Sequence, residues 1–278
     1  MKKIVVTVAL LISISLGILN AQEFSEKLPS NYEIFTKGYV QVKGVSAPGQ
    51  DQYSAIRAAT VVAQRNLLEA IKGVRIYGST TVRRGMTESD IIKTEVEGFL
   101  RGAVRCGSEY FSDGHAEVCM KVYLSGRGGV YATLLPLLKE EGMLPKAKAY
   151  YKPKTKIAPP SQINNPCDGL IVNVKDFPFF KPALINRIIT KKEEVIYDPS
   201  KVACPILTER GCAGYTVSLE KAKVLLKEWG SKNPIIVKAV GVSRFTDVQI
   251  SDDDASAIFV HDKKNNFLTE GKVVFVLY

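Results

Sequence analysis

The chain has 278 residues and a formal net charge of +10, with 46% hydrophobic and 24% charged residues. This composition supplies a core for one large or two ordinary domains, and it excludes a mainly disordered chain. With 21 Gly and 13 Pro, a collagen-like or low-complexity chain is excluded as well. The 2 His residues leave little room for His-based catalysis or a His-rich metal site.

The N-terminal segment has the layout of a secretory signal peptide. Lys2 and Lys3 precede an apolar run over residues 4–19, and Asn20 and Ala21 form a small-residue exit. We expect cleavage after Ala21. The alternative is an uncleaved anchor helix, but the run is shorter than the ~20 residues that cross a bilayer core.

The position of the first cysteine bears on anchoring. A bacterial lipoprotein needs a Cys at the cleavage point, whereas the first Cys here is Cys106. We therefore expect an exported protein without a lipid, either periplasmic or associated with the outer membrane.

The pattern of residues 22–141 predicts an antiparallel sheet wrapped on a long helix. Residues 22–36 read as an irregular lead-in and 37–45 as a strand. A helix is predicted over 53–72, ended by Gly73, with a buried stripe of Ile56, Ala59, Ala63, Leu67, Ala70 and Ile71. A strand over 74–82, a helix capped by Thr87 and a hairpin over 103–124 follow.

The hairpin register decides which cysteines can pair. A three-residue turn at 112–114 sets Phe111 opposite His115 and Cys106 opposite Met120. Cys106 and Cys119 then lie on opposite faces, so we expect no bridge between them. We expect instead that Cys204 and Cys212 form a disulfide across a loop, with a zinc site as the less favoured alternative.

Residues 142–168 change in character and predict a linker between two domains. Prolines alternate here with five lysines: Lys146, Lys148, Lys152, Lys154 and Lys156. Two interpretations stay open, since the segment reads either as a stiff soluble linker, which we favour, or as a basic strip that contacts a polyanion.

Residues 169–278 predict a second domain of mixed α and β structure, so the fold class is α+β overall. Ser218 begins a helix that runs to Trp229, and strong strands are predicted over 235–242 and 273–277. Asp252, Asp253 and Asp254 follow Ser251, where they suit either a calcium site or the first turn of a capped helix, which we favour.

Residues 35–124 resemble a known family. The segments AIRAATVVAQRNLLEAIKGVRIYGSTTV and IIKTEVEGFLRGAVRC are similar to the twenty-kilodalton bacterial surface lipoprotein family and to the N-terminal domain of flagellar assembly protein T. The resemblance implies a helix wrapped by an antiparallel sheet and an assembly role at the cell envelope. It implies no active site, and the chain departs from the lipoprotein members by lacking the lipid-bearing Cys.

Together these patterns predict an exported, non-enzymatic envelope protein with a structural or assembly role. Motifs of hydrolases, metalloproteases and nucleotide-binding loops are absent from the sequence, and we expect no cofactor or metal. The expected partners are envelope or flagellar-base proteins, with oligomers open and no nucleic acid. The alternative is a binding module for an anionic glycan or lipid headgroup, and a hydrolase is the weakest hypothesis.

Overall fold

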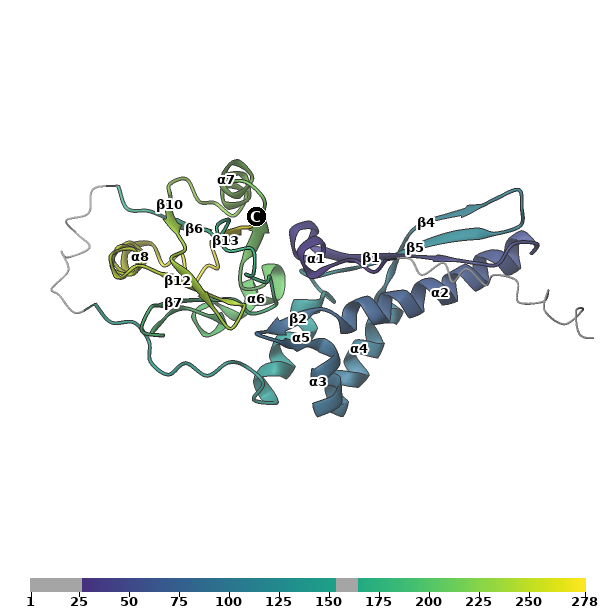
Figure 1. The fold of residues 1–278 in the computed structure, drawn as a ribbon, viewed down its shortest axis with the longest axis horizontal. Coiled ribbons are helices and arrows are strands. Elements are labelled where there is room, and N and C mark those ends of the chain that lie inside the picture. Colours follow the sequence, from purple (N-terminus) through teal and green to yellow (C-terminus); the bar gives the residue numbers. More distant parts are fainter. Residues whose placement is uncertain (1–26, 154–164) are drawn as a thin grey trace, which may run out of the picture.

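The structure, a computed structural model, describes residues 27–153 and 165–278. The molecule is elongated, with an N-terminal half built on a long helix and a C-terminal half built on two four-stranded sheets (Figure 1). The expected signal peptide, residues 1–21, lies outside the described residues. In the described ranges no helix combines the length and the apolar character that a membrane crossing requires.

The N-terminal half begins with a helix where an irregular lead-in was expected. Ser30 caps this helix through the N–H of Glu33, and the Glu33 carboxylate accepts from the N–H of Ser30. The elements of this half are α1 (Asn31–Lys37), β1 (Tyr39–Val45), α2 (Gln52–Lys72), β2 (Arg75–Tyr77), β3 (Thr80–Thr81), α3 (Val82–Glu88), α4 (Asp90–Gly102), β4 (Val104–Tyr110), β5 (Ala116–Tyr123) and α5 (Val130–Glu140).

The antiparallel sheet packs on α2, in strand order β1-β5-β4. Gly44 of β1 lies against Ala59 and Ala63 of α2, so closely that a Cβ at residue 44 would overlap the helix backbone. The small residues of α2 are therefore buried by the sheet, as their spacing predicts. The expected fold class is confirmed: an antiparallel sheet on a long helix, followed by a mixed α/β region.

The hairpin β4–β5 corrects the cysteine pairing. Its turn end has the expected register, because the N–H of Phe111 donates to the carbonyl of His115 and Ser108 faces Val118. A bulge between Arg105 and Gly107 then shifts the register by one residue. The bulge brings Cys106 to the face of Cys119, and the two form a disulfide with Cα atoms 5.1 Å apart.

We predict that Cys106→Ser together with Cys119→Ser lowers the free energy of unfolding by about 2–3 kcal/mol. The link joins residues separated by 13 positions, so it restricts the unfolded chain over that loop. Urea denaturation without reductant measures the loss. Cys204→Ser, which removes an exposed free thiol, is the control and leaves stability within about 0.5 kcal/mol. Equal stability before and after reduction of the wild type would contradict the prediction.

The C-terminal half contains two sheets, ordered β10-β6-β13-β9 and β11-β12-β7-β8. Its elements are β6 (Gly169–Asn173), β7 (Arg187–Thr190), β8 (Val195–Tyr197), α6 (Cys204–Arg210), β9 (Gly214–Thr216), α7 (Leu219–Glu228), β10 (Pro234–Lys238), β11 (Gly241–Ser243), β12 (Asp247–Ile250), α8 (Asp252–Asn265) and β13 (Val273–Val276). The pairs of β6 with β10 and β13 are parallel, whereas β11 pairs antiparallel with β12.

One hydrophobic core runs through both halves. A single cluster of buried residues extends from Ile34 in α1 to Leu277 at the C-terminal end, and a second, smaller cluster lies beneath α7. The backbone also crosses the seam, since the N–H groups of Leu184 and Ile185 donate to carbonyls of β2 at 2.9 Å. The C-terminal residue is fixed as well, because the Tyr32 hydroxyl donates to its backbone oxygen at 2.8 Å.

A buried ion pair lies at this seam. Arg187 of β7 donates through Nη2 to the Asp247 carboxylate of β12 at 2.5 Å, and the two side chains are 5% and 1% exposed. Tyr77 of β2 donates to the same carboxylate at 2.6 Å, so the N-terminal half joins the pair. Burial and this hydrogen bond raise the pKa of Tyr77 to about 12, and the phenol therefore stays protonated at neutral pH.

We predict that Arg187→Met lowers the free energy of unfolding by about 3–5 kcal/mol, because it leaves the Asp247 charge buried without its cation. Adding Asp247→Leu recovers much of the loss, since the double variant carries no buried charge. Denaturant unfolding of the full chain measures both. Lys43→Met, which breaks an exposed pair with Glu117, is the control and costs at most about 1 kcal/mol. A small loss for the single variant would show that Asp247 is solvated.

Candidate functional site

A cleft between α7 and β10 is the larger of the openings that we describe. Ala222 and Leu226 of α7 pack on β6 and β13, so the helix covers the middle of the sheet. The edge strand β10 extends beyond the helix, and Ile236 on that strand is 46% exposed. A cavity of about 520 Å³ opens there, and we call it the α7–β10 cleft.

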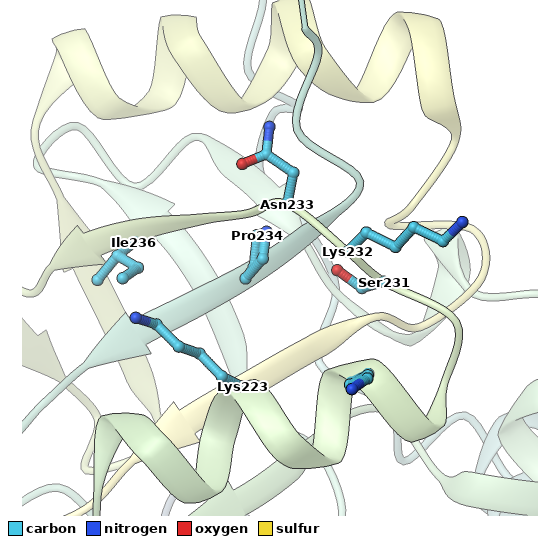
Figure 2. A pocket seen from close by; sticks show the side chains of 7 residues that line it. Lys223, Ser231, Lys232, Asn233, Pro234 and Ile236 are labelled. Atoms are coloured by element: carbon cyan, nitrogen blue, oxygen red, sulfur yellow. The ribbon is translucent and has the colours of Figure 1, made fainter.

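Three lysines line the α7–β10 cleft. Lys223 and Lys227 come from α7, and Lys232 comes from the loop before β10. Figure 2 shows Lys223 reaching from the helix toward β10, whereas the Lys232 side chain points away from it. The positive charges are therefore spread along the rim of the cleft and do not converge on one point.

The loop at the mouth of the cleft is held by Asp168. This carboxylate accepts from the Ser231 hydroxyl at 2.7 Å and from the N–H groups of Lys232 and Asn233 at 2.8 Å. Burial favours the neutral acid, but these donors outweigh it and lower the pKa of Asp168. Its oxygens are thus occupied by the loop, and the exposed lysines determine the charge of the rim.

The geometry of the cleft suits binding better than catalysis. Pro234 and Ile236 form an apolar wall, and the amino groups above them attract anions over a distance without fixing one geometry. The sequence carries a signal for this site that our predictions did not use. Lys223 and Lys227 are four residues apart and share one face of a helix, and Lys232 follows the end of that helix.

The structure describes three lysines of the predicted strip, Lys146, Lys148 and Lys152. Lys148 donates to Glu193 at 2.6 Å, and the backbone oxygen of Lys146 accepts a long hydrogen bond from Arg187. Lys152 is exposed, while Lys154 and Lys156 lie outside the described residues. Part of the predicted linker is also ordered, because the N–H of Tyr151 donates to the carbonyl of Val195 in β8. That these lysines contact a polyanion stays a prediction.

The expected Cys204–Cys212 disulfide is wrong. The segment between these cysteines forms α6, not a loop, with Pro205 in its first turn. Cys204 begins the helix and is exposed, whereas Cys212 is buried beyond Gly211, and both thiols are free. The carbonyl of Cys212 accepts from the buried Tyr197 hydroxyl, so this cysteine belongs to the core.

Both histidines have local structural contacts. His115 stacks on Phe111 with ring centroids 4.2 Å apart, and hydrogen bonds from its backbone and ring lower the pKa of Asp113 in the turn. His261 accepts from the N–H of Cys167 at 3.0 Å. Across residues 27–153 and 165–278, three or more His, Cys, Asp or Glu side chains nowhere gather as a metal site would require.

The acidic run after Ser251 begins α8. The Ser251 hydroxyl accepts from the N–H of Asp254 at 3.0 Å and donates to the carboxylate of the same residue at 2.7 Å. The three acids lie in the first turn, where the helix dipole favours negative charge. The capping interpretation is confirmed.

Comparison with family models matches residues 169–278 to the second domain of Treponema pallidum Tp0624. The α7–β10 cleft lies within this range, which is less than half of the chain. No curated protein matches the chain.

The resemblance of residues 35–124 to the twenty-kilodalton surface lipoproteins and to flagellar assembly protein T is wrong, because the family comparison matches the chain to neither. Small residues on a helix allow close packing against a sheet in many folds. The quoted segments show this packing pattern and do not identify a family.

We predict that replacing the three cleft lysines with Gln weakens binding to an anionic polymer, dextran sulfate, by about tenfold at low salt. The affinity of the wild type falls as salt rises, and this dependence becomes shallower in the variant. Titration at several salt concentrations measures both. The control removes the same charge from three exposed lysines elsewhere: Lys93, Lys139 and Lys191. An equal loss of affinity in the control would mean that binding depends on the net charge of the protein and not on the lysines of the cleft.

Proposed function

We propose that this protein is an exported, non-enzymatic component of a bacterial cell envelope with a structural or assembly role. Export is supported by the N-terminal sequence pattern, and action through protein contacts is supported by one observation, the exposed edge strand β4. The expected flagellar connection depended on the family resemblance that is now overturned, so it is not part of the proposal. The proposed location is the periplasm or the outer membrane, without a lipid anchor.

Strand β4 offers backbone groups to another chain. It forms an edge of the sheet, and all seven of its residues are exposed. Because Phe111 is in a hydrogen-bonded pair with His115, the alternation of an antiparallel ladder directs the N–H and C=O of Ser108 and Tyr110 to the open edge. An extended segment of a second protein can add there as a new strand.

The edge is also held in place. The disulfide from Cys106 to Cys119 fixes the middle of β4 to β5. At one end Arg105 donates to the Thr60 hydroxyl of α2 at 3.2 Å, and at the other end the Tyr110 hydroxyl donates to the backbone oxygen of Gln50 at 2.8 Å. A strand fixed before binding loses little conformational entropy when a partner pairs with it.

We predict that Ser108→Pro weakens the complex with the envelope partner by about tenfold. Proline removes an outward N–H and so a hydrogen bond worth about 1 kcal/mol, and its ring also crowds the incoming strand. The measurement is photo-crosslinking in intact cells from a reactive residue placed at the exposed Glu109 of β4. The folded chain tolerates the change, because the N–H of residue 108 lies outside the β4–β5 ladder.

Ser108→Thr keeps the N–H and a hydroxyl, and it is the matched control with unchanged crosslinking. Fractionation of the same cells tests the other part of the proposal. A protein that stays in the cytoplasm, or a crosslink that persists in Ser108→Pro at full strength, would contradict an envelope role through this edge.

A second candidate function is binding of an anionic polymer such as a glycan or a lipid surface. The α7–β10 cleft supports it, because three exposed lysines line an opening of about 520 Å³ with an apolar wall. Polymer binding that does not weaken with rising salt would count against this candidate.

A further inference from the structure

A second cavity, separate from the α7–β10 cleft and from β4, lies at the seam between the two halves. It has a volume of about 270 Å³ and opens between the end of α1 on one side and α6, β9 and α7 on the other. We call it the seam cavity. Ligand pockets for drug-sized molecules begin near ~300 Å³, so a small molecule is the size that fits.

The walls of the seam cavity are aromatic. Phe35 of α1 meets Tyr215 of β9 edge to face, with ring centroids 5.2 Å apart, and Trp229 at the end of α7 forms a further wall. Phe35 and Tyr215 are almost fully buried, so the rings are held rigidly. Rings at fixed angles favour a flat apolar guest, which can stack on one ring and meet another with its edge.

Tyr131 of α5 lines this cavity and carries a hydroxyl that has no partner among the described residues. The side chain is 3% exposed, and Gly211 packs on the end of the ring that carries the hydroxyl. In the part of the chain that the structure describes, this hydroxyl makes no hydrogen bond. Burial raises its pKa, so it remains a neutral donor.

The ionised side chains that line the seam cavity are those of Arg210 and Lys37. Arg210 at the end of α6 lies over the Trp229 ring, 4.8 Å from its centroid, and donates one N–H to the backbone oxygen of Glu270. Burial lowers the pKa of Arg210, because the cation has lost part of its hydration, and the carboxylates of Glu209 and Glu270 nearby offset part of this effect. Lys37 lies at the rim, and the described lining residues include no carboxylate. A guanidinium with free donors in such a place favours a carboxylate.

We propose that the seam cavity binds a small aromatic carboxylate. The ring lies among Phe35, Tyr131 and Trp229, the carboxylate meets Arg210, and the Tyr131 hydroxyl donates to the ligand. The same chemistry is carried by a free aromatic acid and by the C-terminal phenylalanine of a peptide, and the cavity volume favours the free acid. Because α1 belongs to one half of the molecule and α6 to the other, bound ligand stabilises the whole fold.

The test is calorimetric titration and thermal melting of the full chain with 3-phenylpropionate. We expect saturable binding at millimolar concentration or below and a rise in melting temperature. The neutral amide of the same acid and a tripeptide that ends in phenylalanine are the comparison probes. Both bind at least about tenfold more weakly, a difference of about 1.4 kcal/mol.

Two variants separate ligand binding from folding. Tyr131→Phe melts no lower than the wild type, because it removes a hydroxyl without a hydrogen bond, yet it binds the acid about fivefold more weakly. Tyr197→Phe is the matched control, since its hydroxyl is bonded to the Cys212 carbonyl, and it melts lower. Arg210→Gln weakens binding of the acid about tenfold and brings the amide to the same affinity.

Three outcomes would overturn the proposal: no saturable binding of any probe at millimolar concentration, equal binding of acid and amide by the wild type, or unchanged affinity in Tyr131→Phe and Arg210→Gln. Tighter binding of the peptide than of the free acid would overturn the small-molecule assignment. Lys223→Gln, in the α7–β10 cleft, leaves binding unchanged if the seam cavity is the site.

Discussion

The architecture depends on the buried pair of Arg187 and Asp247. A charge in a core is costly unless it is paired and hydrogen-bonded, and here the pair is completed by a phenol from the other half of the molecule, Tyr77. Removing the N-terminal half would expose the pair and leave the carboxylate with one donor fewer. The ion pair therefore does more than stabilise the C-terminal sheet, because it specifies where the β2–β3 hairpin docks.

The docking of that hairpin explains why the two halves share one core. Backbone hydrogen bonds run from Leu184 and Ile185 to β2, and the Thr246 hydroxyl accepts from the N–H of Gly78. Once these contacts form, α1 lies against β9, and Phe35 packs on Tyr215. The backbone groups of Leu184, Ile185 and Gly78 are thus used in joining the halves, and the groups left for partners lie on the edge strand, the α7–β10 cleft and the seam cavity.

The sequence predicts contacts that depend on neighbours along the chain, and it misses contacts that depend on distant ones. The helix over 52–72 and the pairing of Ser108 with Val118 follow from local periodicity and turn length. The disulfide was missed because one bulge reverses the face of Cys106, and the sequence signals that bulge only weakly, through Gly107 inside the strand. Arg187 and Asp247 are 60 residues apart, and Tyr77 is a further 110 from the arginine, so no local pattern marks the seam.

A shared core limits how the molecule can work. Two domains on a flexible linker could close on a partner, whereas here the backbone of residues 149–151 pairs with β8 and one cluster of buried side chains spans the seam. Hinge motion between the halves would break the Arg187–Asp247–Tyr77 contacts, which is costly in a low-dielectric interior. The hairpin β4–β5 projects at the end of the molecule away from the C-terminal half (Figure 1). Under the proposed function, a partner paired with β4 would therefore be held at a fixed distance from the lysines of the α7–β10 cleft.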